Sequence, residues 1–144
     1  MALTLVACTP DQENDTMTPE QSRQKLISEI ITVIQAMAPG ARVDSSVEDR
    51  DLPCGGLAGA EYTSVHSYVV VTGSAGIGGT ETDVMAKTRT PLEQKGWKIT
   101  RNRKSGETSR FSVDKPGTGS GVLLVSPEDI VFNGETLCVD NPDR

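Results

Sequence analysis

One segment of this chain has the spacing of an amphipathic helix with well-defined ends. Its apolar residues recur every three or four positions and so share one helix face: Leu26, Ile27, Ile30, Ile31, Val33, Ile34, Met37 and Ala38. Thr18 is placed as the N-cap and Pro19 as the first helical residue, with Gln21 completing a capping box. Pro39-Gly40 ends the helix. Because an apolar helix face has to be buried against a second layer, the chain must build a helix-covered core.

The second layer is predicted to be a sheet. Residues 62–72 are dense in β-branched and aromatic side chains, and their alternation places Val65, Val69 and Val71 on one face and His66, Tyr68 and Val70 on the other. Weaker alternation predicts further strands, at residues 41–47, 97–101, 109–114, 122–126, 130–132 and 136–139. Turns are expected at 102–106, 116–120 and Asn133-Gly134. We expect residues 62–72 to lie centrally in the sheet.

A second helix is expected between the strands, from Thr80 to Gly96. Thr80 and Asp83 form a capping box. Val84, Met85, Thr88 and Leu92 place apolar or small side chains on one helix face. Pro91 should kink or divide this helix. The order α-β-β-α-β-β-β-β predicts an α+β fold in which two helices pack on one face of a twisted, mainly antiparallel sheet. We assign this single domain to residues 18–140 and a frayed C-terminus to 141–144.

The N-terminal residues place a cysteine after a short apolar run. Leu5-Val6-Ala7-Cys8 matches a lipobox, in which small side chains precede the cysteine that receives the lipid. A complete signal also carries a basic segment and about 7 to 15 apolar residues. We therefore interpret residues 1–8 as a truncated lipoprotein signal; the alternative is a chance apolar N-terminus with a free cysteine. Residues 9–17 are polar and acidic, which predicts a flexible tether.

The three cysteines support this interpretation. If Cys8 carries the lipid, then Cys54 and Cys138 remain as a pair in an oxidising compartment, where disulfides form. The alternative is two buried free thiols. We therefore predict lipidation at Cys8, a disulfide between Cys54 and Cys138, and a domain on the extracytoplasmic face of the cell membrane.

Charge and motif content narrow the classes of function. The net charge is -6, and the 14 Lys and Arg are dispersed along the sequence, which argues against nucleic acid as a partner. Val69 to Gly79 looks like the nucleotide-binding turn of short-chain dehydrogenases, but its glycine spacing is one residue short and no Tyr-x-x-x-Lys follows. We interpret Gly73 to Gly79 as a strand-to-helix connection. We expect no cofactor.

Few residues offer catalytic or metal chemistry. Glu48-Asp49-Arg50-Asp51 lacks the alternating oxygen ligands and glycine of a calcium loop, so we interpret it as a solvated charged turn. His66 is the only histidine, which leaves no histidine-rich metal set, and we interpret it as structural. A hydrolase built from Ser64, His66 and the carboxylates of residues 48–51 is conceivable, but no nucleophile motif supports it.

Architectural markers along the chain resemble one group of proteins. The lipobox, the tether, Cys54 after the first strand, Gly96-Trp97 after the second helix and Gly134 to Cys138 are similar to small actinobacterial cell-envelope lipoproteins of the mycobacterial LppA-like type. The resemblance implies an envelope protein attached to the membrane by its lipid. We expect a non-catalytic binding or accessory module that presents its sheet face or the Gly73 to Gly79 loop to an envelope protein or small-molecule ligand. The alternatives are a cell-envelope hydrolase and a phage-encoded surface-exclusion lipoprotein.

Overall fold

The computed structural model describes residues 17–54, 64–74 and 81–142. Its elements are α2 (Pro19–Met37), β1 (Val43–Pro53), β2 (Ser64–Gly73), α3 (Glu81–Gln94), β3 (Lys98–Ser105), β4 (Thr108–Lys115), β5 (Gly119–Val125), β6 (Ile130–Thr136) and β7 (Val139–Asp140). The lipobox with Cys8, the tether up to residue 16, Thr80 and residues 75–79 of the glycine-rich connection lie outside the described residues. Within the described ranges, no helix is long and apolar enough to cross a membrane.

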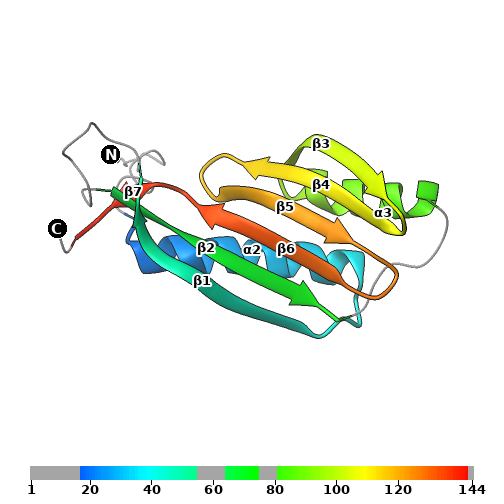
Figure 1. The fold of residues 1–144 in the computed structure, drawn as a ribbon, viewed down its shortest axis with the longest axis horizontal. Helices are drawn as coiled ribbons and strands as arrows, with labels where there is room; N and C mark the ends of the chain where they lie inside the picture. The colour runs from blue at the N-terminus through cyan, green and yellow to red at the C-terminus, as the bar shows by residue number, and fades with distance from the viewer. Residues whose placement is uncertain (1–16, 55–63, 75–80, 143–144) are drawn as a thin grey trace, which may run out of the picture.

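The strands form a seven-stranded sheet in the order β1-β2-β6-β5-β4-β3, and β7 also pairs with β2. Every pairing is antiparallel. After β2, helix α3 carries the chain to the far edge of the sheet, and the β3-β4-β5-β6 meander returns it to β2 (Figure 1). The predicted α+β fold and element order are therefore confirmed, with β2 as an interior strand beside the edge strand β1.

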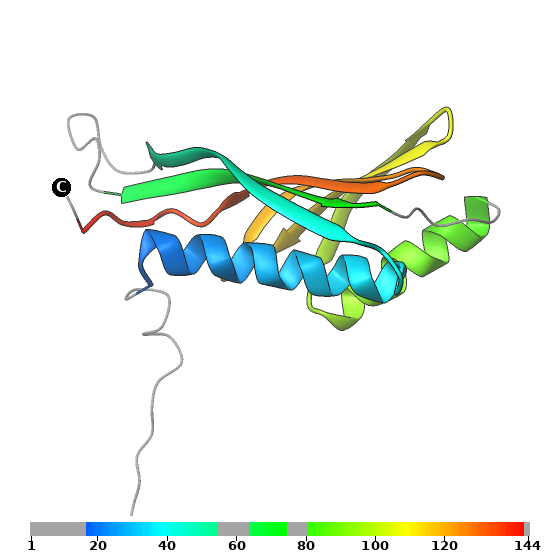
Figure 2. The same ribbon diagram turned by 90° about the horizontal axis from the view of Figure 1, so that it is seen from below.

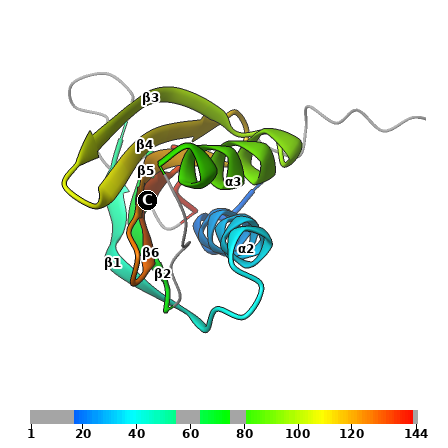
Figure 3. The same cartoon turned by 90° about the vertical axis from the view of Figure 1, so that its right-hand side faces the viewer.

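Both helices lie on one face of the twisted sheet (Figures 2 and 3). Helix α2 begins as predicted: the Thr18 side chain accepts a hydrogen bond from the Gln21 backbone, and the Gln21 side chain accepts one from the Thr18 backbone. The core between the layers combines the α2 stripe, residues at the end of α3 and after it, and alternate strand residues: Leu26, Ile30, Val33, Ile34, Met37, Leu92, Trp97, Val69, Val71, Phe111, Val113, Leu123, Val125, Ile130 and Phe132. The predicted faces of β2 and the helix stripe are thus observed.

The turn predicted at Asn133-Gly134 is wrong, because both residues lie inside β6. Asn133 pairs with Val70 and Gly134 with Val69 across the β2–β6 ladder. A Cβ atom on Gly134 would collide with the ring of Phe132, which lies over this part of the inner sheet face. This glycine makes room for an aromatic core residue instead of forming a turn.

Three other local predictions need correction. Residues 48–51 are exposed as expected, but they form part of β1 with two register irregularities, and Asp51 has a φ of 54°. Pro91 does not divide α3, because Thr88 and Leu92 on either side of it are fully buried and hold the helix to the core. Residues 102–104 belong to β3, and the β3–β4 turn lies at Gly106, whose φ is 62°.

Candidate functional site

The face of the sheet that carries no helix, which we call the open face, is formed by the residues that alternate with the core positions. Across the sheet, Tyr68 pairs with Glu135, and Glu135 pairs with Ser120. In the next row, Val70 pairs with Asn133, which pairs with Val122. The open face therefore presents ordered rows of side chains from β2, β6 and β5.

A hollow of about 380 Å³ lies on this face. It is open to solvent and is lined by residues of β1, β2, β5 and β6: Glu48, Tyr68, Val69, Val70, Ser120, Gly121, Asn133, Gly134 and Glu135. Tyr68 is 40% exposed and is the large hydrophobic residue that the described chain leaves exposed. The hollow thus combines one aromatic ring with two carboxylates, an amide and a hydroxyl group.

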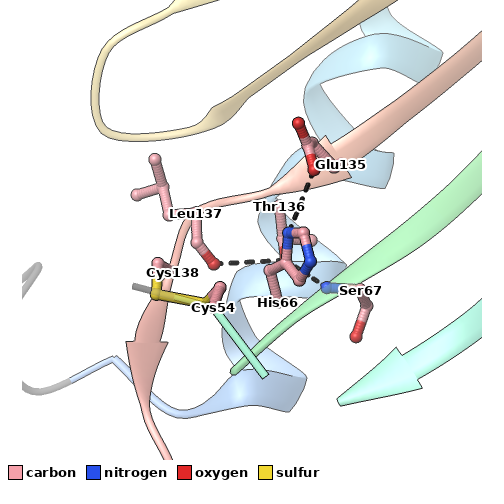
Figure 4. The surroundings of a disulfide bond; sticks show 7 residues. All are labelled: Cys54, His66, Ser67, Glu135, Thr136, Leu137 and Cys138. Atoms are coloured by element: carbon pink, nitrogen blue, oxygen red, sulfur yellow. Dashed lines mark hydrogen bonds and ion pairs between the residues drawn. A yellow bond between two sulfur atoms is a disulfide. The ribbon is translucent and has the colours of Figure 1, made fainter. Parts of the chain in front are cut away.

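His66 lies at one end of this row of side chains. Its Nδ1 atom is 3.0 Å from Oε2 of Glu135 (Figure 4). Its ring centroid is 5.2 Å from that of Tyr68. Below the pair, the Ser67 backbone N–H donates to the hydroxyl of Thr136, which donates to the Leu137 carbonyl. These hydrogen bonds hold the ends of β2 and β6 together, so Glu135 is positioned beside His66.

The predicted disulfide between Cys54 and Cys138 is confirmed, with the two Cα atoms 5.9 Å apart. Cys54 follows β1, and its backbone N–H donates to the Ser64 carbonyl at 3.0 Å, so β1 and β2 stay aligned up to the bridge. Cys138 lies between β6 and β7. The bridge therefore closes the same end of the sheet as the His66–Glu135 pair (Figure 4).

Of the residues from which a hydrolase could have been assembled, Ser64 lies two residues before His66 on β2, but two of the carboxylates contact groups other than His66. Glu48 lines the hollow and accepts a hydrogen bond from Ser46 at 2.7 Å, whereas Asp51 binds Arg23 of α2 at 2.8 Å. The carboxylate that reaches His66 is instead Glu135, which lies 69 residues further along the chain. Sequence reasoning missed Glu135 because it placed a turn at Asn133-Gly134. Alternation continued through these residues would have placed Glu135 on the open face.

The arrangement favours binding of a positively charged group. Two carboxylates attract a cation, and an exposed tyrosine ring can bind an ammonium or guanidinium group through its face. Ser120 and Asn133 add a hydroxyl and an amide that can orient a polar ligand. In the part of the chain that the structure describes, no three His, Cys, Asp or Glu side chains gather as metal ligands.

Comparisons with known proteins supply no family for this chain. No model of a known protein family matches it, and no curated protein does. Among solved structures, it is similar to the crystal structure of a DUF4853 family protein from Actinomyces odontolyticus. The sequence identity is 7%, the alignment covers 94% of this chain and 71% of that one, and the TM-score is 0.45. A similarity this distant carries no functional argument.

Proposed function

We propose that this protein is an extracytoplasmic, lipid-anchored module that binds a cationic ligand on its open face without changing it chemically. The hollow beside Tyr68 and Glu135 carries the proposal. It is open and lined on two sides by carboxylates, which suits reversible binding of an ammonium or guanidinium group. The protein's net charge of -6 would also attract such a ligand at long range.

The lipid anchor is the second part of this proposal. Cys8 would carry the lipid, the polar residues 9–17 would hold the domain away from the membrane, and an oxidising location would suit the Cys54–Cys138 bridge. The membership of this chain among LppA-like envelope lipoproteins stays a prediction from the sequence markers.

Binding can be tested by NMR titration of the disulfide-bonded chain with a short lysine peptide. We expect shift changes at Tyr68, Asn133 and Glu135, and at least about tenfold weaker binding in Glu135→Gln or Tyr68→Ala. A peptide acetylated at both its ε-amino groups and its N-terminus should not bind, because it lacks the ammonium charge. Glu93→Gln on α3 removes the same charge away from the open face and is the matched control. Equal weakening by Glu93→Gln would contradict a specific site.

The anchor can be tested in a precursor that carries a complete lipoprotein signal. Cys8→Ala should move the protein from the membrane fraction to the soluble fraction, because each buried acyl methylene contributes about 0.8 kcal/mol to membrane binding. Thr9→Ala, at the neighbouring position, should stay in the membrane fraction. Membrane retention of Cys8→Ala would contradict the anchor.

A hydrolase remains the second candidate because of one observation, the 3.0 Å contact between His66 and Glu135. A carboxylate can orient an imidazole as a general base. Mass spectrometry of the bound peptide after incubation separates the two functions. Unchanged peptide supports the binding module, whereas cleavage that is lost in His66→Gln supports the hydrolase.

A further inference from the structure

Three arginines gather on the open face at the opposite edge of the sheet from the hollow. Arg103 of β3 lies directly across from Arg110 of β4, and Arg101 lies across from Ser112. All three arginines are exposed, and with Ser112 they line a small hollow of about 90 Å³. The tip of this hairpin extends on the side of the sheet away from both helices (Figures 2 and 3).

What sets this cluster apart is that two of its guanidinium groups lie directly opposite each other, and no described acidic residue pairs with any of the three. Elsewhere Arg23 binds Asp51, Arg89 binds Glu93 and Lys115 binds Glu29. None of the three hairpin arginines makes an ion pair or side-chain hydrogen bond with another described residue. Like charges directly opposite each other on neighbouring strands destabilise a hairpin. In a chain with 20 acidic and 14 basic residues, a bound anion would relieve that repulsion.

We propose that Arg101, Arg103 and Arg110 form an anion site for the phosphoryl group of a soluble phosphate ester. A guanidinium group donates two parallel hydrogen bonds to an oxyanion, and a tetrahedral phosphoryl group offers enough oxygens for several arginines at once. The hollow has room for about three water molecules at ~30 Å³ each, so it can hold one such group while the rest of the ester stays in solvent. Ser112, which also lines the hollow, adds a hydroxyl donor.

A soluble ligand is favoured over a membrane surface. The open face that carries the cluster also carries Glu48 and Glu135 in the larger hollow, and the whole chain has a net charge of -6. An extended anionic surface would meet these carboxylates together with the arginines, whereas a small phosphate ester contacts the arginine cluster alone. The site is independent of the ligand proposed for the larger hollow.

The test is an NMR titration of the disulfide-bonded chain with glycerol phosphate and with inorganic phosphate, followed through the arginine Nε–H signals. We expect saturable shifts at all three arginines, and a rise in melting temperature in phosphate over chloride of equal ionic strength that is larger in the wild-type protein than in Arg103→Gln, because phosphate also stabilises proteins non-specifically. Arg103→Gln and Arg110→Gln should each weaken binding by about tenfold or more. Arg101→Lys, which keeps the charge but loses the planar fork, should also weaken it.

Arg89→Gln on α3 removes one positive charge from the helix side and should leave phosphate binding unchanged. Equal weakening by Arg89→Gln, or an equal response to phosphate and chloride, would overturn the site in favour of general charge screening. Binding to phosphatidylglycerol vesicles without binding to either soluble phosphate would overturn it in favour of membrane adsorption. Because the three arginines are exposed, the variants are expected to fold.

Discussion

Arginines lie in opposite environments on the two faces of the sheet: buried and paired on the helix-covered face, exposed on the open face. On the helix-covered face, the Arg23 side chain is 9% exposed, and its guanidinium donates to Asp51 at 2.8 Å and to the Ser67 hydroxyl at 3.4 Å. On the open face, Arg103 and Arg110 lie opposite each other, and neither has an acidic partner among the residues that the structure describes. A buried charge must be paired because its desolvation is costly, whereas solvent stabilises an exposed one.

The same contrast holds for apolar residues. Leu123 and Leu124 are neighbours in β5, yet Leu123 is completely buried beneath the helices and Leu124 is only half-buried on the open face. The covered face therefore determines stability, and the open face is available for ligands. Variants on the two faces test this division.

The disulfide should stabilise the whole domain. Its sequence separation is 84 residues, for which the loss of chain entropy in the unfolded state predicts about 4.5 kcal/mol. We expect Cys54→Ala/Cys138→Ala to lower the free energy of unfolding by about that amount in urea titrations. The wild-type protein under reducing conditions is the control and should behave like the variant. An unchanged unfolding midpoint in both would contradict a stabilising bridge.

The neighbouring leucines offer a matched pair for the two faces. Leu123→Ala should cost about 3 kcal/mol, because it leaves a cavity between the sheet and the helices. Leu124→Ala should cost less than about 1 kcal/mol, since its side chain is already partly in water. Urea unfolding of both variants measures the difference. Equal costs would mean that the open face is covered in solution.

The arginines give a second matched pair. Arg23→Met keeps the apolar stem but leaves the Asp51 carboxylate without its ion-pair partner, and we expect a loss of about 2 kcal/mol. Asp51 is 44% exposed, so the cost is below that of a fully buried pair. Arg103→Met should leave stability within about 0.5 kcal/mol or raise it, because it removes the repulsion with Arg110. Thermal melts compare the two. If Arg103→Met destabilised the protein as much as Arg23→Met does, the exposed and the buried arginine would contribute equally to stability, which would contradict the difference between the two faces.

The smallest expected effect is at Glu135. Its pair with His66 is partly exposed, with the Glu135 side chain 40% accessible, so Glu135→Gln should change stability by less than about 1 kcal/mol. Ligand binding in the hollow should fall markedly in the same variant. A large loss of stability instead would show that Glu135 serves the fold, and it would remove the support for a ligand site.

Much of the fold was predictable because local signals agreed with it. The capping box at Thr18, the stripe of α2 and the alternation of β2 are each specified by neighbouring residues, and each is observed. Predictions failed where packing against distant residues outweighed the local sequence preference. Asn133-Gly134 has turn chemistry, but the space needed by the Phe132 ring explains Gly134 inside a strand. Packing of Thr88 and Leu92 likewise keeps α3 intact through Pro91.

The candidate sites were less predictable. The sequence identified His66 and its face of β2, but the pairing of Tyr68 with Glu135 depends on the register between two strands that are far apart in the chain. The basic residues look dispersed along the sequence, and only the β3–β4 register brings Arg101, Arg103 and Arg110 together. Such juxtapositions depend on strand register, which residue type alone does not reveal.

The sequence by itself determined the helices, most of the strands, the buried faces and the two cysteines available for a bridge. Periodicity and capping are properties of neighbouring residues, so they can be recognised without a structure. Tertiary structure decided which strands lie side by side, and through them the hollow at Tyr68 and the arginine cluster on the hairpin. The physical reason is that both sites consist of side chains from different strands, which only the sheet brings within contact distance.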